Sequence, residues 1–357
     1  MIQKSKASLP FLMPAKTNSS DQSVSMQEIA DRCSVVQATV SNVLRNRPNG
    51  RVGDETREKI FRAAIELRYK MRSDQRIDSR KRQIGYLLLD LDFAYRDSFY
   101  SGSLVRQIKM IEESFDFNVQ IYTYPRDQFD RMLYKAVCGD YCDALVLSRY
   151  GGEELVNELV ERLPIPLVYL DDSHGLKCSS LSPNMDAMGR IAAEHLYQKG
   201  YRKFAVFGGY LSDYRGMRGL GFVNFLKELG IPSKDIIIYD EEYGFNGGRM
   251  MALQLIKQLT REPVGVFSHD DDVGFSALQA FQEQRISVPN QVGIIGCNNA
   301  VHSPYTYPPL SSIDLMANDH AQTLLRMLTN SMKENRIDTI RTPLKLIPRG
   351  STMLTPD

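Results

Sequence analysis

Continuous apolar runs recur along most of the chain, and amphipathic stretches separate them. Beyond residue 82, eight runs are strand candidates: IGYLLLD, VQIY, DALVLS, PLVYLD, KFAVFGG, DIIIYD, VGVFS and VGIIG. Between them lie helical patterns of roughly 10–15 residues, among them GSLVRQIKMIEESF, MGRIAAEHLYQKG and GFSALQAFQEQR. Strands that are apolar throughout are buried on both faces, which predicts parallel sheets covered by helices on either side.

Eight such units exceed one open sheet of ordinary size, so the alternation predicts two doubly wound lobes. The chain length of 357 residues leaves room for them, because a domain takes roughly 150 residues. After the eighth run, the helical pattern DHAQTLLRMLTNSMKE leads into TPLKLIPRG, which we expect to contain an edge strand. Residues 83–357 are therefore predicted to form an α/β body with parallel sheets.

Residues 24–69 have a different pattern, with helical periodicity and no strand candidate. Ser25 and Glu28 form a capping box that starts a helix ending near Arg32. A second helix is predicted from Gln37 to about Leu44, and the loop RNRPNGRVG separates it from a third. The third helix has one apolar face, formed by Ile60, Phe61, Ala64, Ile65 and Leu67.

Charge is distributed unevenly between this head and the body. Residues 1–82 hold 17 Lys/Arg and 9 Asp/Glu, about +8, which leaves 27 basic and 34 acidic residues, about −7, from the totals of 44 and 43. A basic head on an acidic body indicates that the head meets a polyanion. Residues 1–23 are predicted to be a loosely ordered tail without a secretory signal, and 70–82 a linker.

The second helix of the head, QATVSNVL, has the character of a DNA-reading helix. Val40, Val43 and Leu44 face inward at helical spacing, whereas Gln37, Ala38, Ser41 and Asn42 face outward. Gln and Asn side chains can each form a bidentate pair with adenine, and the hydroxyl of Thr39 or Ser41 can hold a phosphate. We add Ser25 and Arg45 to the predicted DNA contacts. An ordinary three-helix cap with polar outer residues remains the alternative.

The order of these segments resembles the lactose/galactose repressor (LacI/GalR) family of bacterial transcription regulators. EIADRCSVVQATVSNVL, ETREKIFRAAIELRY and IGYLLLD carry the resemblance at the N-terminal end. It continues through DALVLS, IPLVYLD, EHLYQKGYRKFAVFGG, RGLGF, ISVPNQVGIIGCNN and PPLSSIDL, and so covers about 24–352. The co-occurrence of this head with these body segments is highly specific.

The resemblance implies a helix-turn-helix head over 24–69, a hinge over 70–82 and a two-lobed effector domain over 83–357, similar to type I periplasmic sugar-binding proteins. It implies an N-lobe from about 83–181 plus 307–335 and a C-lobe from about 182–306 plus 336–357. The family's base-reading pair falls on Gln37 and Ala38, and a later base contact falls on Asn42.

Two departures from the family concern the head and the hinge. The usual Gly-Val-Ser turn is Ser34-Val35-Val36 here, which puts a Cβ into the turn and removes an N-cap worth roughly 0.5–2 kcal/mol. In the hinge, the leucine that wedges into the minor groove in the family is replaced by Asp78, a carboxylate unsuited to that role. Ile77 is a candidate substitute and Arg76 a candidate DNA contact, but a simple tether over 70–82 is equally compatible.

An effector site is expected where parallel strands end, in the cleft between the lobes. Phe99 and Tyr100 match family positions that form an aromatic wall, and Tyr243 matches an aromatic near the cleft. Arg218 matches an arginine that clamps ligand oxygens. His269-Asp270 stand where the family usually has Asn-Asp, and Asn298 where it usually has Asp. Arg218 in a surface ion pair and Tyr243 as a packed edge are the structural alternatives.

Catalytic and metal signatures are weak. No phosphate-binding glycine loop and no G-x-S-x-G nucleophile motif occurs, so we predict neither a catalytic residue nor a cofactor. Consecutive side chains of Asp270-Asp271-Asp272 diverge, which argues against a metal site there. The five cysteines are scattered and contain no C-x-x-C pair, as in a reducing cytosol, and no apolar run is long enough to span a membrane.

These observations predict a cytoplasmic bacterial repressor, associated with the nucleoid when bound, that is not an enzyme. It would bind double-stranded operator DNA as a homodimer, under the control of a small metabolite, most simply a sugar. The alternative is a sugar-sensing or solute-binding protein without a DNA role. An enzyme built on the same two-lobed scaffold is the third class considered.

Overall fold

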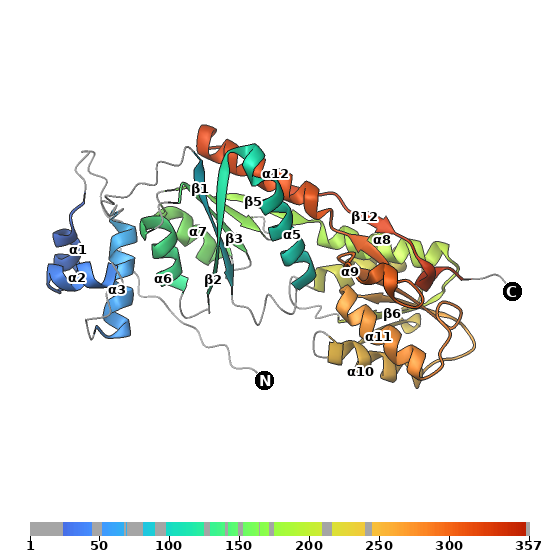
Figure 1. Ribbon diagram of the computed structural model, residues 1–357. Coiled ribbons are helices and arrows are strands. Elements are labelled where there is room, and N and C mark those ends of the chain that lie inside the picture. The colour runs from blue at the N-terminus through green and yellow to red at the C-terminus, as the bar shows by residue number, and fades with distance from the viewer. Residues whose placement is uncertain are drawn as a thin grey trace.

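The computed structural model describes residues 24–44, 52–67, 69, 81–89, 98–124, 129–139, 142–148, 153–163, 165–170, 175–208, 216–239 and 245–354. They form a small helical head and two α/β lobes, which follow one another along the long axis of the molecule (Figure 1). The fold is therefore the predicted one: a helical head on a two-lobed α/β body with mostly parallel sheets.

Three helices form the head: α1 (Met26–Cys33), α2 (Gln37–Leu44) and α3 (Asp54–Glu66). The predicted capping box is present, because Ser25 Oγ accepts a hydrogen bond from the Glu28 N–H at 3.3 Å and Glu28 Oε2 accepts one from the Ser25 N–H at 2.5 Å. Fully buried side chains from all three helices meet in the head: Ile29, Ala30, Val40, Ile60 and Ala64. Spacing and capping thus gave the helices correctly.

The first sheet belongs to the N-lobe, and all its strand pairs are parallel. Its strands, in spatial order, are β11 (Thr339–Thr342), β5 (Ser179–Pro183), β4 (Leu167–Leu170), β3 (Ala144–Ser148), β1 (Arg82–Leu89) and β2 (Phe117–Tyr124). Its helical segments are α5 (Ser98–Ile111), η1 (Glu112–Phe115), α6 (Phe129–Tyr134), η3 (Lys135–Gly139), α7 (Glu153–Arg162) and α12 (Ala317–Glu334). The core on one face includes α5 and α12, and the core on the other includes α6 and α7.

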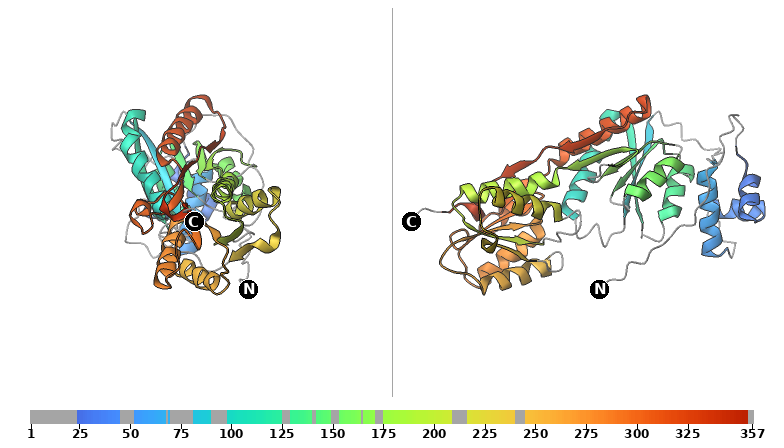
Figure 2. Two further views of the ribbon diagram at one scale, coloured as in Figure 1. Left: turned by 90° about the vertical axis from the view of Figure 1, so that its right-hand side faces the viewer. Right: turned by 180° about the vertical axis from the view of Figure 1, so that it is seen from behind.

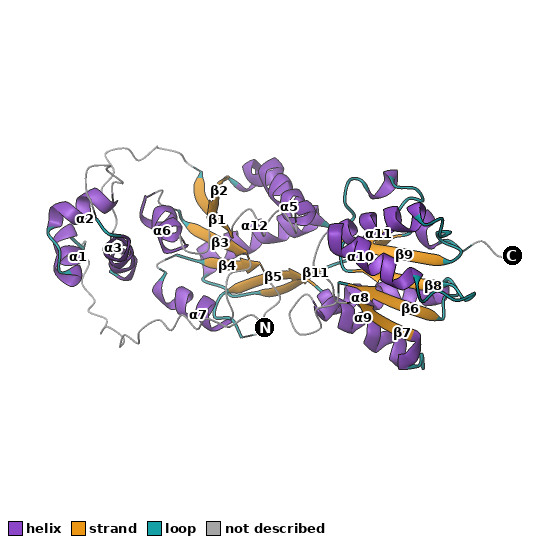
Figure 3. Ribbon diagram, turned by 90° about the horizontal axis from the view of Figure 1, so that it is seen from below, coloured by secondary structure: helices purple, strands orange, loops and turns teal. Residues whose placement is uncertain are grey.

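The second sheet belongs to the C-lobe and repeats this order, with an antiparallel strand, β12, at one edge. Figure 3 shows its strands β9, β8, β6 and β7 beside the helices of the lobe. Its strands are β12 (Lys345–Ile347), β10 (Ser311–Asp314), β9 (Val292–Cys297), β8 (Val264–Ser268), β6 (Lys203–Phe207) and β7 (Ile236–Tyr239). Its helical segments are α8 (Met185–Gln198), α9 (Gly216–Glu228), η4 (Ser233–Asp235), α10 (Phe245–Ile256), α11 (Asp271–Glu283), η5 (Ser303–Tyr305) and η6 (Gly350–Thr352). Helices α8 and α9 cover one face, and α10 and α11 the other.

The chain crosses between the lobes at three described places: after β5, after β10 and after β11. The N-lobe therefore comprises 82–183 and 317–342, and the C-lobe 185–314 and 345–354. The sequence-based boundaries, which put 307–335 in the N-lobe and 336–357 in the C-lobe, were wrong for β10 and β11. The hydropathy pattern did not reveal where these two strands belong, because both are short and rich in Ser, Thr and charged residues. TPLKLIPRG does contain the predicted edge strand, β12.

Several predicted segments lie outside the described residues: the tail 1–23, the loop 45–51 and the linker 70–80. Of the predicted linker, only its last two residues are described, and Arg82 already begins β1. In the part of the chain that the structure describes, no helix is long and apolar enough to cross a membrane.

Candidate DNA interface and effector site

The turn between α1 and α2 is built without glycine. Ser34 ends α1 with φ 57° and ψ 44°, a left-handed conformation that costs a residue with a Cβ roughly 1–2 kcal/mol. Two backbone hydrogen bonds close the turn, from the Ser34 N–H to Asp31 O at 3.2 Å and from the Val35 N–H to Ala30 O at 3.0 Å. The sequence-based expectation that a side-chain-bearing residue adopts the turn geometry is confirmed.

Helix α2 buries one side and presents the other. Val40, Val43 and Leu44 lie in the head core, whereas Gln37 and Ala38 are exposed, and Thr39, Ser41 and Asn42 are half-buried. Val36 precedes the helix with 68% of its surface exposed and carries no side-chain acceptor for the first N–H groups. The α1–α2 pair lies at the end of the molecule that is farthest from the C-lobe (Figure 2). One side of α2 therefore faces the surrounding solvent and is not covered by the rest of the described structure.

In the C-lobe, polar groups gather where β6, β8 and β9 end. Arg218, on α9, is only 4% exposed, and its Nη1 donates to His269 O at 2.7 Å. Its Nε lies 3.3 Å from Met185 Sδ. The guanidinium therefore contacts His269, the residue that follows β8, and at least two of its five N–H groups have partners among the described residues.

Asp270 follows His269 and starts α11. Its carboxylate accepts a hydrogen bond from the Val273 N–H at 2.9 Å, which makes Asp270 the N-cap of the helix. Both His269 and Asp270 are buried. Because β6 pairs with β8 and β8 with β9, all in parallel, the residues that follow these strands share one edge of the sheet.

Asn298 follows β9 at the same edge. Its backbone has φ 94°, and the next residue, Asn299, has φ 45°. The Asn298 N–H donates to Ile313 O at 2.9 Å, but its buried side-chain oxygen Oδ1 receives no hydrogen bond within the described structure. A buried amide oxygen without a donor is costly, and a ligand hydroxyl or N–H would relieve that cost.

Two family profiles match the chain. One, described as bacterial regulatory proteins, lacI family, matches residues 25–71, and the other, a periplasmic binding protein-like domain, matches residues 193–352. Catabolite control protein A of Priestia megaterium is 25% identical over 338 residues, which cover 92% of this chain and 99% of the relative. The ribose operon repressor of Haemophilus influenzae is 27% identical over 300 residues, 81% of this chain and 86% of the relative.

The chain belongs to the LacI family. It is a DNA-binding transcriptional regulator of the helix-turn-helix type. Among solved structures, the lac repressor dimer bound to operator and an anti-inducer superposes with a TM-score of 0.67 at 19% identity, covering 94% of this chain and 100% of that one. The CelR–cellobiose complex gives a TM-score of 0.65 at 18% identity, covering 92% and 99%. At such identities the two superpositions support the fold.

The structure brings only some of the predicted site residues together. Arg218, His269, Asp270 and Asn298 meet at one edge of the C-lobe sheet. Phe99 and Tyr100 lie in the first turn of α5, but their side chains are outside the described structure, as are Tyr243, Arg45 and Arg76. In the head, Ser25 is exposed and its hydroxyl is occupied as the cap of α1.

Sequence reasoning missed Asp271, the carboxylate with the most partners at this edge. It is 1% exposed and accepts three hydrogen bonds, from the Ala300 N–H at 2.6 Å and from Ser303 Oγ and Ser312 Oγ at 2.7 Å each. Burial raises the pKa of Asp271 to about 7, against the pull of those donors. The hint that the sequence offers is the acidic triplet 270–272, of which the family resemblance assigns a role to Asp270 alone.

The triplet does not form a metal centre. In the described part of the chain, no group of three His, Cys, Asp or Glu side chains is arranged to hold a metal ion. Each member has its own environment: Asp270 caps α11, Asp271 ties the loop after β9 to β10, and Asp272 is buried beside Asp270. Burial, followed by repulsion from Asp270, raises the pKa of Asp272 to about 7.

Proposed function

We propose that this LacI-family regulator is a homodimeric repressor whose operator affinity is set by a small polar metabolite, a sugar or sugar derivative, bound between the two lobes. The observation that carries the proposal is the uncovered polar side of α2, with Gln37 and Ala38 exposed beside a buried core face. A polar helix face at the free end of a basic head has the position and chemistry of a groove-reading element.

In this proposal, Gln37, Ala38 and Asn42 read base edges in the major groove. Thr39, Ser41, Ser25 and Arg45 contact phosphates and fix the register, and Arg76 reaches the DNA from the linker. The exposure of Gln37 and Ala38 supports the first assignment. The net charge of about +8 on residues 1–82 supports a strong phosphate contribution to binding.

The effector is proposed to bind at the C-lobe edge. Arg218 and Asp270 would hold ligand hydroxyls, and Asn298 Oδ1 would accept a hydrogen bond that it does not receive within the described protein. His269 would form part of the polar wall, and Phe99, Tyr100 and Tyr243 an aromatic one. Paired hydroxyls suit this mixture of guanidinium, carboxylate and amide groups. Ligands named for similar proteins point the same way: one relative is a ribose operon repressor, and similar structures contain cellobiose and ribose.

A dimer is proposed because one small head makes few base contacts and two-fold operators match two-fold proteins. The loop between β9 and β10 supports it with three exposed apolar side chains: Val301 at 66%, Tyr305 at 83% and Tyr307 at 81%. Such a surface is suited to burial against a second copy. Sedimentation of the full-length protein tests this: a monomer at micromolar concentration would contradict the dimer.

The regulator is further proposed to act in the bacterial cytoplasm on nucleoid DNA and to catalyse no reaction. The test is recovery of genomic fragments by the purified protein, repeated against a panel of sugars. We expect enrichment of a palindromic duplex, binding that weakens steeply with salt, and one sugar class that changes the recovery. A protein that ignores all duplex DNA at low salt would instead be a solute-binding protein.

A further inference from the structure

Helix α3 is buried on more of its circumference than a three-helix head requires. Its buried residues are Ile60, Phe61, Ala63, Ala64 and Ile65. At 100° per residue these positions span an arc of roughly 200°, about twice the width of a stripe that packs on one neighbour. One part of the arc faces the α1–α2 core, so the remainder has a second contact.

The second contact is the N-lobe. The Phe61 ring stacks on the Tyr134 ring of α6, with centroids 4.7 Å apart and planes inclined by 30°. Both side chains are buried, and the apolar core of the head continues without a break into the N-lobe core around Leu133 and Val137. Figure 1 shows α3 placed between the α1–α2 pair and α6.

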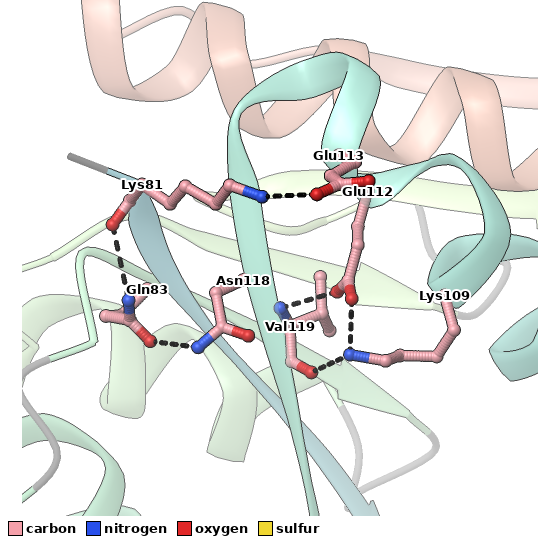
Figure 4. Close-up of polar contacts among 7 residues, drawn as sticks. All are labelled: Lys81, Gln83, Lys109, Glu112, Glu113, Asn118 and Val119. Carbon is pink, nitrogen blue, oxygen red and sulfur yellow. Dashed lines mark hydrogen bonds and ion pairs between the residues drawn. The ribbon is translucent and has the colours of Figure 1, made fainter. Parts of the chain in front are cut away.

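The linker is also held where it enters the N-lobe (Figure 4). Lys81 Nζ pairs with Glu113 Oε1 at 2.9 Å, and the Lys81 carbonyl oxygen accepts a hydrogen bond from Gln83 Nε2 at 3.2 Å. Asn118 Nδ2 donates to Gln83 Oε1 at 2.6 Å, which ties the start of β1 to β2. The helix before the linker and the strand after it are thus fixed on the same lobe.

This contact leaves the DNA-reading side uncovered. Gln37 and Ala38 stay exposed while α3 is docked. We infer that docking of α3 on the α6–η3 surface through the Phe61–Tyr134 stack holds the head in an orientation ready for DNA, and couples it to movements of the N-lobe. The orientation of α2 then does not depend on a wedge in the linker, where Asp78 stands.

The direct test is the tumbling of the head in the full-length protein, measured by NMR relaxation of backbone amides in residues 25–67. We expect these amides to relax with the rotational correlation time of the whole particle. In Tyr134→Ser the rotational correlation time of these amides should fall at least twofold, because the head would then move as a small domain on a tether. Tyr134→Phe keeps the ring and should keep the long correlation time. A wild-type head that tumbles independently would overturn the inference.

A second readout is affinity for a mixed-sequence 40-base-pair duplex at low salt. Tyr134→Ser should bind about tenfold more weakly, because a freed head must be ordered again on each binding event. The matched control is Tyr239→Ser, which removes a buried tyrosine of the C-lobe and should leave affinity unchanged. Equal or tighter binding by Tyr134→Ser would overturn the proposed role. Absence of DNA binding by the wild type would instead refute the proposed function, and the relaxation test would still decide the docking.

Discussion

Among the turns that place residues other than glycine in the left-handed region, the one at Ser34 in the head and the one at Asn298-Asn299 in the C-lobe are supported differently. In the head, Ser34 has φ 57° and its turn is closed by backbone hydrogen bonds to Asp31 and Ala30. In the C-lobe, Asn298 and Asn299 have φ 94° and 45°, and a network of side chains holds the turn.

The C-lobe network reaches far along the chain. Asn299 N–H donates to Ser312 Oγ at 3.0 Å, and its Nδ2 donates to Asp314 Oδ2 at 3.0 Å. Arg349 Nη2 donates to Asn299 Oδ1 at 2.6 Å, and Asp271 accepts the Ala300 N–H. Four side-chain contacts therefore hold the left-handed turn of the C-lobe, whereas two local backbone hydrogen bonds close the turn of the head and Lys59 Nζ donates to Cys33 O beside it at 3.2 Å.

This difference in support indicates which of the two regions is more easily disordered. The strained residues of the C-lobe lie at the proposed effector site, and a rigid loop there presents Asn298 in one orientation. The head has a small core, and next to its turn the described side-chain contact with the backbone is Lys59 Nζ donating to Cys33 O at 3.2 Å. By the docking inference, the contact of α3 with the N-lobe adds to the order of the head. Four substitutions or conditions test this contrast, in decreasing order of expected effect.

Asp271→Ala should have the largest effect. It leaves an N–H and two hydroxyls without their acceptor inside the protein, so the free energy of unfolding should fall by about 3 kcal/mol or more. Urea unfolding followed by circular dichroism measures it. Asp186→Ala, at an exposed carboxylate of α8, is the control. A loss as small as the control's would mean that the loop needs no support.

The same residue should give the C-lobe an unusual pH dependence. Burial raises the pKa of Asp271 from 3.8 to about 7, so between these values the unfolded chain loses its proton first. Its contribution to stability is therefore greatest in acid and declines as pH rises from about 4 to 7. Subtracting the unfolding curve of Asp271→Asn isolates this contribution. A difference that grows with pH would have the opposite sign and contradict the assignment.

Arg218→Ala should cost about 2 kcal/mol of stability, since it removes the donor to His269 O and opens a gap next to Met185. It should also abolish the rise in melting temperature produced by any sugar that stabilises the wild type. Arg249→Ala, an exposed arginine paired with Glu283 on the same lobe, should leave that rise intact. If the sugar-induced rise survives in Arg218→Ala, Arg218 is not part of the effector site.

Ser34→Gly should have the smallest effect and the opposite sign. Glycine adopts φ 57° without the Cβ penalty, so the head should gain up to about 1 kcal/mol. Ser34→Ala keeps the Cβ and should give no gain. Thermal unfolding monitored by NMR signals of the head distinguishes the two. Equal gains from glycine and alanine would show that the turn is not strained.

The sequence predicted what depends on local patterns and missed what depends on distant partners. The capping box of Ser25 and the apolar strand runs are local, and both were confirmed. Strand β5 was missed because it is SSLSP, whose serines are buried only through partners such as Ser331 and Thr339. The exchange of β10 and β11 between the lobes has the same cause.

The residues at the proposed effector site differ in the same way in how far the sequence predicts them. Arg218 and Asp270 were predicted from positions of the resembling family, and their binding of an effector stays a prediction. In the structure, Arg218 donates from α9 to His269 O, and Asp270 is the N-cap of α11. Asp271 was not found, because its three partners lie 29, 32 and 41 residues away in the sequence. Its role exists only once α11, the loop after β9 and strand β10 have come together.

The most direct measurement of the proposed mode of DNA recognition is a fluorescence anisotropy titration of a genomic duplex recovered by the protein, with wild type and Gln37→Ala. We expect the wild type to bind the recovered duplex at least ~10³-fold more tightly than a scrambled one, with affinity falling linearly in log salt. Gln37→Ala should lose about 1–3 kcal/mol on the recovered duplex and almost nothing on the scrambled one. Equal affinity of the wild type for both duplexes, or equal losses by Gln37→Ala on both, would show that α2 does not read bases.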